Sequence, residues 1–333
     1  MNTTEKMIAI CNTLPGWCAA YFLETGPGLS VTTRLAYSRE ISHFLDYLIA
    51  YVPQFSEEKK DSITLEQFES VTSQDISRYL TLYMDKGRQE KTLARKRAAL
   101  SSFFNYMTAN RKLSFNPVSA AVRVKVHQKD EVLHLDFAEQ VDLLKEVDTA
   151  DNLSKHAKAF HEKYRLRDIA MITLLLDTGI RVSELRGINV GDLDLEECSA
   201  VVLRKGGNIQ NVYYSDACSE AINEYLNERK EQITPKTPLF VTQSGTRITV
   251  RSIERLVKKY ASAAVPGKGQ KISPHKLRSS FAMGFYEEEK DILALQRKMG
   301  HKSIVATNYY AKATDQKMQE TRNVMADRRK REQ

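Results

Sequence analysis

The sequence predicts a mainly α-helical fold of the α+β class, with one small β-hairpin and two domains. Apolar residues recur at helical spacing along most of the 333 residues. Two short β-rich runs, 199–204 and 209–215, flank the turn-forming sequence 205–208, which reads Lys-Gly-Gly-Asn. With 42% hydrophobic residues, the chain can form two cores. Single cores stop growing at roughly 250 to 300 residues.

Residues 1–118 are expected to form an all-helical N-terminal domain. Ser30 is a favourable N-cap for a first helix, in which apolar residues follow at helical spacing up to Leu48. Thr72 can cap a second helix that ends at Gly87. A third helix carries an apolar face from Leu100 to Met107 and stops before Pro117, because the residue before a proline is biased away from the helical conformation.

A dense basic cluster marks the start of that third helix. Like charges gathered on one helix often form only a solvated face, but they can also contact the phosphates of a nucleic acid. We predict the second role and expect DNA contacts from five residues: Arg88, Lys91, Arg95, Lys96 and Arg97.

The segment 119–134 loses helical periodicity and is interpreted as a basic interdomain linker. It contains Arg123 and Lys125, which we also predict to contact DNA. The second domain is expected over residues 135–313, and residues 314–333 form a charged C-terminal arm.

The second domain is expected to be mostly helical around the hairpin. Asp136, with Glu139 three residues later, predicts a capping box at the start of its first helix. The polar stretch 151–163, rich in Lys and His, is interpreted as an inserted loop. The remaining helices are expected at 216–230, 249–264, 274–287, 291–299 and 303–312.

Charge and cysteine content narrow the class of protein. The 50 Lys and Arg residues exceed the 42 Asp and Glu residues, so the net charge of +8 favours an anionic partner such as nucleic acid. Four separated cysteines show neither zinc-ligand nor disulfide-framework spacing and are expected to be free thiols in a reducing cytosol. No apolar run of about 18 residues is present, so a membrane partner is not expected and the cytoplasm is the predicted location.

Four short motifs in the second half carry chemically useful side chains. They are Thr178 to Leu185 with Arg181, the hairpin lysine Lys205, His275-Lys276-Leu277-Arg278, and Gly300-His301 followed nine residues later by Tyr310. Each alone is explained by surface or packing roles. Their order and spacing together are much more specific.

Together the motifs resemble those of the tyrosine recombinase or phage integrase family, within it the Xer-like site-specific recombinases. The resemblance is strong over 167–312 and weaker in the N-terminal domain. It implies an N-terminal helical DNA-clamp domain and a C-terminal catalytic domain. It also implies an enzyme that cleaves and rejoins DNA through a 3′-phosphotyrosyl intermediate, with Tyr310 as the nucleophile.

The chemistry of phosphodiester cleavage fits the residues of these motifs. Arg181 and Arg278 can give bidentate hydrogen bonds to the phosphoryl oxygens and keep their charge at physiological pH. They would do the work of metal ions, so no metal and no cofactor are expected. Lys205 is the expected general acid for the leaving 5′ oxygen.

Three further residues complete the predicted site. His275 and His301 would add hydrogen bonds to the phosphate, and His275 could accept the proton of the tyrosine. Glu184, one helical turn from Arg181, is expected to orient the cationic groups rather than to touch the substrate.

The resemblance leaves one choice, that of the nucleophile, and the sequence departs from the family pattern at two places. Tyr309 is the alternative nucleophile, but the interval from His301 favours Tyr310. Members often carry basic residues on the second hairpin strand, where this chain has Gln210 and Asn211, so DNA contacts there are expected to be weaker or different. Met299 precedes the glycine where leucine is usual, and it fills the same space.

Two other functions use related features. A type IB topoisomerase-like enzyme would relax DNA with the same kind of residues, and a non-catalytic DNA-binding protein could keep the fold. The resemblance implies double-stranded DNA with a specific recombination site as partner, and a homo- or heterotetramer on two duplexes joined through the C-terminal arm. Integration or excision of mobile DNA and resolution of chromosome or plasmid dimers would share this one active site.

Overall fold

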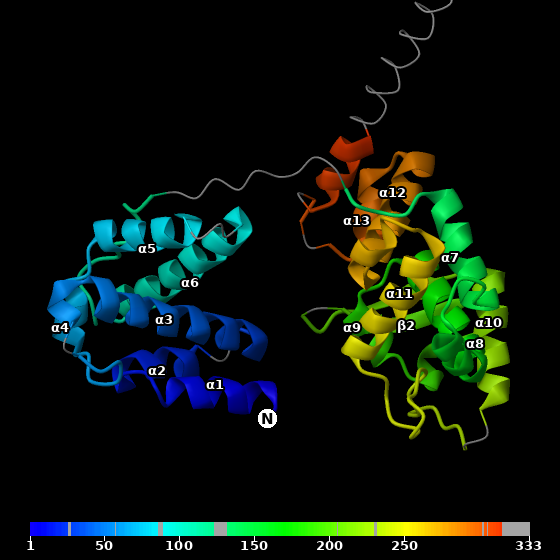
Figure 1. Ribbon diagram of the computed structural model, residues 1–333, viewed down its shortest axis with the longest axis horizontal. Coiled ribbons are helices and arrows are strands. Elements are labelled where there is room, and N and C mark those ends of the chain that lie inside the picture. The colour runs from blue at the N-terminus through cyan, green and yellow to red at the C-terminus, as the bar shows by residue number, and fades with distance from the viewer. Residues whose placement is uncertain are drawn as a thin grey trace, which may run out of the picture. The chain divides into compact units, whose positions relative to one another are not determined.

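The computed structural model describes the chain except for residues 26–27, 57, 86–88, 123–131, 205, 230–231, 302, 305 and 315–333. The chain divides into two compact units, Met1–Gln128 and Lys129–Gln333 (Figure 1). The finer division into domains, linker and arm stays a prediction, and each unit is described by itself below.

Helices form the first unit, and none of its described residues lies in a β-strand. Ser30 caps α3 by accepting a hydrogen bond from the Thr33 amide at 3.2 Å, and the Thr72 hydroxyl accepts one from the Asp75 amide at 3.3 Å at the start of α5. The elements are α1 (Thr3–Cys11), α2 (Gly16–Glu24), α3 (Val31–Tyr51), η1 (Pro53–Phe55), α4 (Leu65–Glu69), α5 (Ser73–Asp85) and α6 (Glu90–Ala109). The predicted α3, α5 and α6 are confirmed, whereas α1, α2 and α4 were not predicted.

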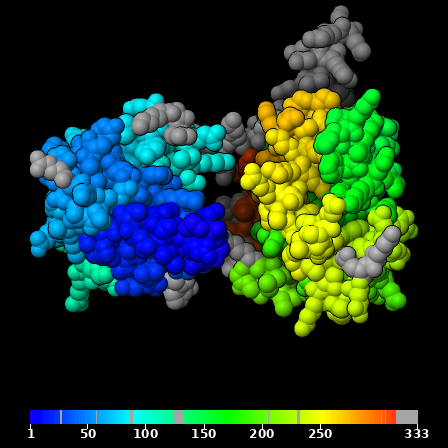
Figure 2. Space-filling model, turned by 60° about the horizontal axis from the view of Figure 1, so that its bottom comes forward, coloured from blue at the N-terminus to red at the C-terminus, as the bar shows by residue number. Residues whose placement is uncertain are grey.

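An aromatic core holds these helices together. Phe44 of α3 and Tyr79 of α5 meet edge to face with their ring centroids 5.1 Å apart, and Phe68 stacks on Phe104 of α6 at 5.1 Å. Offset and edge-to-face pairs of this kind add to the stabilisation that burial gives. Figure 2 shows this unit from a second side, with α1 and α2 in dark blue forming much of the visible surface.

The second unit is mostly helical with one small sheet. The predicted capping box is present at the start of its first helix, where Asp136 accepts a hydrogen bond from the Glu139 amide at 2.9 Å. Its labelled helices are α7 (Phe137–Thr149), α8 (Lys155–Thr178), α9 (Val182–Gly187), η2 (Val190–Asp192), α10 (Asp216–Glu228), α11 (Val250–Ala264), η3 (Gly269–Lys271), α12 (Pro274–Glu289) and α13 (Ile292–Met299). A final helical stretch covers 306–314.

The interpretation of 151–163 as an inserted loop was wrong for most of that segment. Helix α8 begins at Lys155, because the hydroxyl of Ser154 caps it by accepting a hydrogen bond from the Ala157 amide at 3.4 Å. His161 is buried and its Nδ1 lies 3.1 Å from the hydroxyl of Tyr260 in α11. The polar side chains of this segment therefore lie on an otherwise ordinary helix.

The sheet has three antiparallel strands in the order β1 (Leu193–Asp194), β2 (Ser199–Leu203) and β3 (Ile209–Tyr213). The predicted hairpin is confirmed, with Leu203 paired to Ile209 at its end. Gly206 and Gly207 turn the chain with φ angles of 100° and 87°, a region that glycine enters without strain. The short β1 was not predicted.

The core of the second unit lies between α8, α9, the sheet, α10 and α11. Its fully buried residues include Leu174, Leu175, Val202 and Tyr260. A smaller apolar cluster joins α12, α13 and the final helical stretch, and it includes Met283, Leu295 and Met299. No described helix is long and apolar enough to span a membrane.

Candidate active site

The first site residue, Arg181, lies where α8 turns into α9. Gly179 ends α8 with a φ of 57°, and a Cβ atom there would lie 2.3 Å from the ring of Phe281, so only glycine fits. Arg181 then serves as the N-cap of α9. Both its amide and its Nη1 donate to the carboxylate of Glu184 at 2.8 Å. The side chain of Arg181 is 32% exposed, so Glu184 orients a guanidinium that solvent and substrate can still reach.

Arg278, in the first turns of α12, is deeply buried. Its Nη1 donates to the Gly179 carbonyl and its Nη2 to the Met299 carbonyl. Burial, followed by repulsion from Arg181, lowers the pKa of Arg278 to about 10, so it stays protonated at neutral pH. A guanidinium has five N–H groups, and these two bonds use two of them.

Two histidines lie beside these arginines. Partial desolvation, then Lys276, Arg278 and Arg181, lower the pKa of His275, although much of the residue is exposed. Burial and the cations Arg278, Arg181 and Arg204 lower the pKa of His301 to about 4. His301 Nδ1 lies 2.9 Å from the hydroxyl of Thr307. Both rings are therefore neutral at pH 7 and can form hydrogen bonds without adding charge.

Tyr310 lies in the final helical stretch, 306–314, and is 5% exposed. Its ring packs in the apolar cluster with Met283, Leu295 and Met299. Tyr310 also lies close enough to Arg278 to interact with it electrostatically. Tyr309 is partly exposed at the edge of the same cluster. The choice of Tyr310 over Tyr309 as nucleophile stays a prediction.

Lys205, the predicted general acid, lies outside the described residues. The hairpin on either side of it is closed by a hydrogen bond from the Arg204 amide to the Asn208 carbonyl at 2.7 Å. Its assignment as the acid therefore stays a prediction.

Sequence reasoning missed Arg204, a buried arginine next to Lys205. Its Nη1 donates to Glu184 Oε2 at 2.7 Å, so Glu184 binds both Arg181 and Arg204. The alternation of β2 gave a signal for it, because Ala200, Val202 and Arg204 fall on the same, buried side of the strand.

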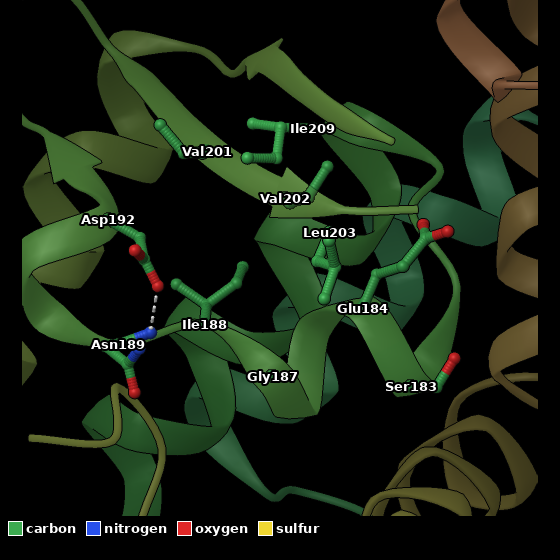
Figure 3. A pocket seen from close by; sticks show the side chains of 10 residues that line it. All are labelled: Ser183, Glu184, Gly187, Ile188, Asn189, Asp192, Val201, Val202, Leu203 and Ile209. Carbon is green, nitrogen blue, oxygen red and sulfur yellow. Dashed lines mark hydrogen bonds between the residues drawn. The ribbon is translucent and has the colours of Figure 1, made fainter. Parts of the chain in front are cut away.

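A pocket of about 390 Å³ lies between α9 and the hairpin, and Glu184 is one of the residues that line it. Figure 3 shows Val201, Leu203 and Ile209 on its hairpin side and Ser183 and Glu184 on its α9 side. Most of the surface of this pocket is apolar, and an apolar surface does not suit a charged phosphate. The cationic groups Arg181 and Arg278 therefore define the anion site better than this pocket does.

The basic residues of the first unit that were predicted to contact DNA differ in their exposure and in their partners. Lys91 is exposed, and the largely exposed Arg95 donates to Glu40 at 2.9 Å. Arg97 donates to the Val118 carbonyl at 3.0 Å. Lys96 is buried and paired with Glu40 at 2.6 Å, so its ammonium does not face a ligand. The other three predicted contacts, Arg88, Arg123 and Lys125, lie outside the described residues.

The second unit thus gathers two arginines, two neutral histidines and a tyrosine from four separate chain segments. Such an arrangement can bind the phosphoryl oxygens of a phosphodiester, stabilise the charge of a transition state, and bring a phenol to the phosphorus. Among the described residues, no group of three or more His, Cys, Asp or Glu is placed to hold a metal ion.

Comparison with family models matches both parts of the chain. Residues 143–317 match the model of the phage integrase family, and residues 19–111 match that of the phage integrase N-terminal SAM-like domain. The first match includes all six predicted catalytic residues, from Arg181 to Tyr310.

Similar proteins cover most of the chain. The tyrosine recombinase XerC of Caldanaerobacter subterraneus subsp. tengcongensis is 32% identical over 81% of this chain and 72% of its own length. The tyrosine recombinase XerD of Oceanobacillus iheyensis is 26% identical over 90% and 94%.

Solved structures share the fold. The XerH site-specific recombinase bound to a palindromic difH substrate matches with a TM-score of 0.67 and 18% identity, over 97% of this chain and 95% of that chain. The Tn1549 transposon integrase in complex with a circular intermediate DNA matches with a TM-score of 0.64 and 21% identity, over 93% and 99%.

Proposed function

The chain belongs to the phage integrase family and is a tyrosine site-specific recombinase, and we propose that it cleaves DNA with Tyr310 as nucleophile. The product of this step is a 3′-phosphotyrosyl intermediate. The observation that carries the proposal is that Arg278 lies within electrostatic reach of Arg181, His275, His301 and Tyr310, although these residues come from distant parts of the sequence. Arg278 also binds the carbonyl of Met299, whose side chain packs in the same cluster as Tyr310.

The two arginines stabilise the charge that develops on the phosphoryl oxygens. Arg278 is fixed by two backbone carbonyls and Arg181 by Glu184, so neither needs to reorganise when the substrate binds. Fixed cations in a partly buried site are worth more than mobile ones in water. The repulsion between Arg181 and Arg278 is relieved when a phosphate lies between them.

The reaction also moves two protons. The Tyr310 oxygen forms a bond to phosphorus while the bond from phosphorus to the 5′ oxygen breaks. His275 is neutral at pH 7 and so can accept the phenolic proton, and Lys205 donates a proton to the leaving 5′ oxygen. A 5′ hydroxyl of a second strand later attacks the phosphotyrosine, and the same steps in reverse restore the DNA backbone without a cofactor.

The proposed partner is double-stranded DNA that carries a recombination site. Lys91, Arg95 and Arg97 of the first unit are the described residues that we propose as phosphate contacts, and Lys96 is left out because it is buried. Strand exchange requires two sites held together, so we propose four subunits on two duplexes, connected through residues 314–333. We propose the cytoplasm as its location, which is consistent with a DNA substrate.

The alternatives are less well supported. The XerC and XerD proteins compared above are called recombinases, not topoisomerases. A purely DNA-binding role would not require a tyrosine beside two arginines and two histidines.

Covalent capture tests the proposal. A pool of short duplexes with a randomised centre, each nicked in one strand, is incubated with the whole chain in excess EDTA, and protein–DNA adducts are isolated under denaturing conditions. Sequencing of the captured DNA then identifies the site. We expect an adduct enriched in one sequence. Absence of any adduct, or an adduct that forms only when Mg²⁺ is added, would contradict the proposed chemistry.

A further inference from the structure

Arg204 is a buried charge at the end of a strand whose exposed side is apolar. Strand β2 turns Ala200 and Val202 inward, and Arg204 continues that inward row. On the opposite side Leu203 is exposed. Burying an arginine costs free energy unless its donors are satisfied, so its partners reveal what it holds.

Each of the three guanidinium nitrogens of Arg204 binds a different element. Nη1 donates to Glu184 Oε2 in α9 at 2.7 Å, and Nε donates to Gln210 Oε1 in β3 at 3.0 Å. Nη2 donates to the Lys298 carbonyl in α13 at 2.8 Å. Only 4% of the side chain is exposed, so Arg204 holds protein groups and does not reach a substrate.

The C-terminal end of α13 receives three such bonds in a row. Carbonyl groups at a helix C-terminus lack partners within the helix. Here the Arg297 carbonyl accepts from Gln210 Nε2 at 3.0 Å, the Lys298 carbonyl accepts from Arg204, and the Met299 carbonyl accepts from Arg278. Three consecutive carbonyls therefore connect α13 to β3, to Arg204 at the end of β2, and to α12.

Gly300 completes this connection. It follows the last of these carbonyls with a φ of 58°, and a Cβ atom on it would lie 2.9 Å from Arg204 Nε. The close approach of Arg204 thus requires glycine at this position. The next residue is His301, so the position of Arg204 also fixes where the chain leaves α13 for the histidine.

We propose that Arg204 is a positioning residue for DNA cleavage, which holds Glu184, and through it Arg181, in fixed register with the end of α13 that carries His301. The inference rests on the proposed function. Arg204 joins two phosphate-binding groups that come from separate elements, and Gln210 supports it from β3.

The test uses the site recovered from the randomised pool and three forms of the phosphate to be cleaved. One form is the normal phosphodiester. The second is a methylphosphonate, in which a methyl group replaces a nonbridging oxygen and removes the negative charge. The third has sulfur in place of the bridging 5′ oxygen, so that the leaving group needs no proton. The measured quantity is the rate of adduct formation by the full chain.

Arg204→Met keeps the length of the side chain and removes all its donors. We expect it to slow cleavage of the normal phosphate about 10- to 100-fold, the usual effect of losing a group that orients a functional side chain. The defect should shrink to within about threefold on the methylphosphonate, because a neutral group does not need precisely placed cations. It should persist on the sulfur substrate, because proton donation is intact.

Two further variants control for folding. Gln210→Leu removes the acceptor of Arg204 Nε and the donor to the Arg297 carbonyl, but it leaves the bonds from Arg204 to Glu184 and Lys298 in place. It should therefore show the same pattern with a smaller defect. Arg229→Met removes an arginine that donates to the carbonyls of Pro238 and Leu239 elsewhere in the unit, and it should cleave all three substrates at the normal rate.

Three outcomes would overturn the inference. Rescue by sulfur would mean that Arg204 acts through the hairpin lysine. Equal slowing on all three substrates by Arg204→Met and Gln210→Leu would mean a general structural role, and a normal rate for Arg204→Met would mean no role. Failure of the unaltered chain to form any adduct would instead contradict the proposed function itself.

Discussion

Both units contain a buried glutamate that binds two cations, and the two arrangements serve different ends. In the first unit Glu40 binds the exposed Arg95 and the buried Lys96. In the second, Glu184 binds the partly exposed Arg181 and the buried Arg204. In each case the buried cation ties helices or strands together and the other cation remains accessible.

The surroundings of the two glutamates differ. Lys96 is enclosed by aromatic side chains, with its ammonium 3.1 Å from the hydroxyl of Tyr79 and 3.8 Å from the centre of the Tyr83 ring. Near Glu184 lies a third arginine, Arg278. Arg181 and Arg204, the two partners of Glu184, both act with Arg278 on His301 and lower its pKa. Similar ion pairs thus anchor a core in one unit and, in the function that we propose, hold an arginine ready for a phosphate in the other.

The largest expected difference between the two accessible cations is in catalysis. Arg181→Ala should lower the rate of adduct formation about 10²- to 10³-fold, the usual cost of removing one group that stabilises a charged transition state. Arg95→Ala should leave that rate unchanged at saturating DNA. Single-turnover kinetics with the nicked site measures both. Equal defects would show that the first unit also acts in the chemical step.

The two lysines of α6, Lys91 and Lys96, should differ in their effect on stability, because one is exposed and the other is buried. Lys96→Met leaves the buried Glu40 with two exposed partners, Arg95 and, at 3.9 Å, His43. We expect the loss of its buried partner to lower the free energy of unfolding by about 3 kcal/mol. Lys91→Met, at an exposed position, should change it by less than about 0.5 kcal/mol. Urea titration measures both, and an equal effect of the two variants would contradict the anchoring role of Lys96.

The lowered pKa of His301 predicts that the stability of the second unit depends on pH. The pKa of His301 falls from an ordinary 6.5 to about 4 in the folded chain, so the unfolded chain binds the proton more tightly. The contribution of His301 to stability is therefore complete above about pH 6.5 and declines as the pH falls toward 4. NMR titration of labelled histidines, assigned with His301→Gln, should find this ring titrating near pH 4 in the free protein. A value near 6.5 would contradict the crowding of cations around it.

The smallest expected effect is on the salt dependence of DNA binding. Lys91→Met should reduce the slope of log affinity against log salt by about 0.9, the contribution of one phosphate contact. Lys96→Met should leave the slope unchanged, because its ammonium is buried. A change of slope for Lys96→Met alone would reverse our assignment of these two residues.

Local patterns in the sequence were enough to predict much of the fold. Ser30, Thr72 and Asp136 cap helices as their side chains suggested, and the glycines after Lys205 make the hairpin turn. These features depend on contacts within a few residues. Helices α1 and α2 were missed, although Met7 and Cys11, the buried residues of α1, lie four residues apart at helical spacing.

The burial of Lys96 could have been predicted from the helical periodicity of the sequence. Lys96 follows Leu93 by three residues and precedes Leu100 by four, so helical spacing places it on the buried face of α6. The cluster of like charges concealed this. Its partner Glu40 lies 56 residues earlier in the sequence, and no local rule connects the two.

The network around Arg204 was beyond sequence reasoning for the same physical reason. Strand alternation indicates that Arg204 points inward, but its partners Glu184, Gln210 and Lys298 lie on three elements brought together only by folding. The motif residues were recognised individually, whereas the contacts that align them depend on tertiary structure.

The identity of the covalently bound residue tests the central claim most directly. Trypsin cleaves after Lys302 and Lys312, so one peptide, 303–312, contains both Tyr309 and Tyr310. After digestion of the DNA in the trapped adduct, fragmentation of this peptide by mass spectrometry should place the nucleotide on Tyr310. Tyr310→Phe should yield no adduct while still binding DNA. A nucleotide on Tyr309, or an adduct that persists in Tyr310→Phe, would contradict the assignment of Tyr310 as the nucleophile.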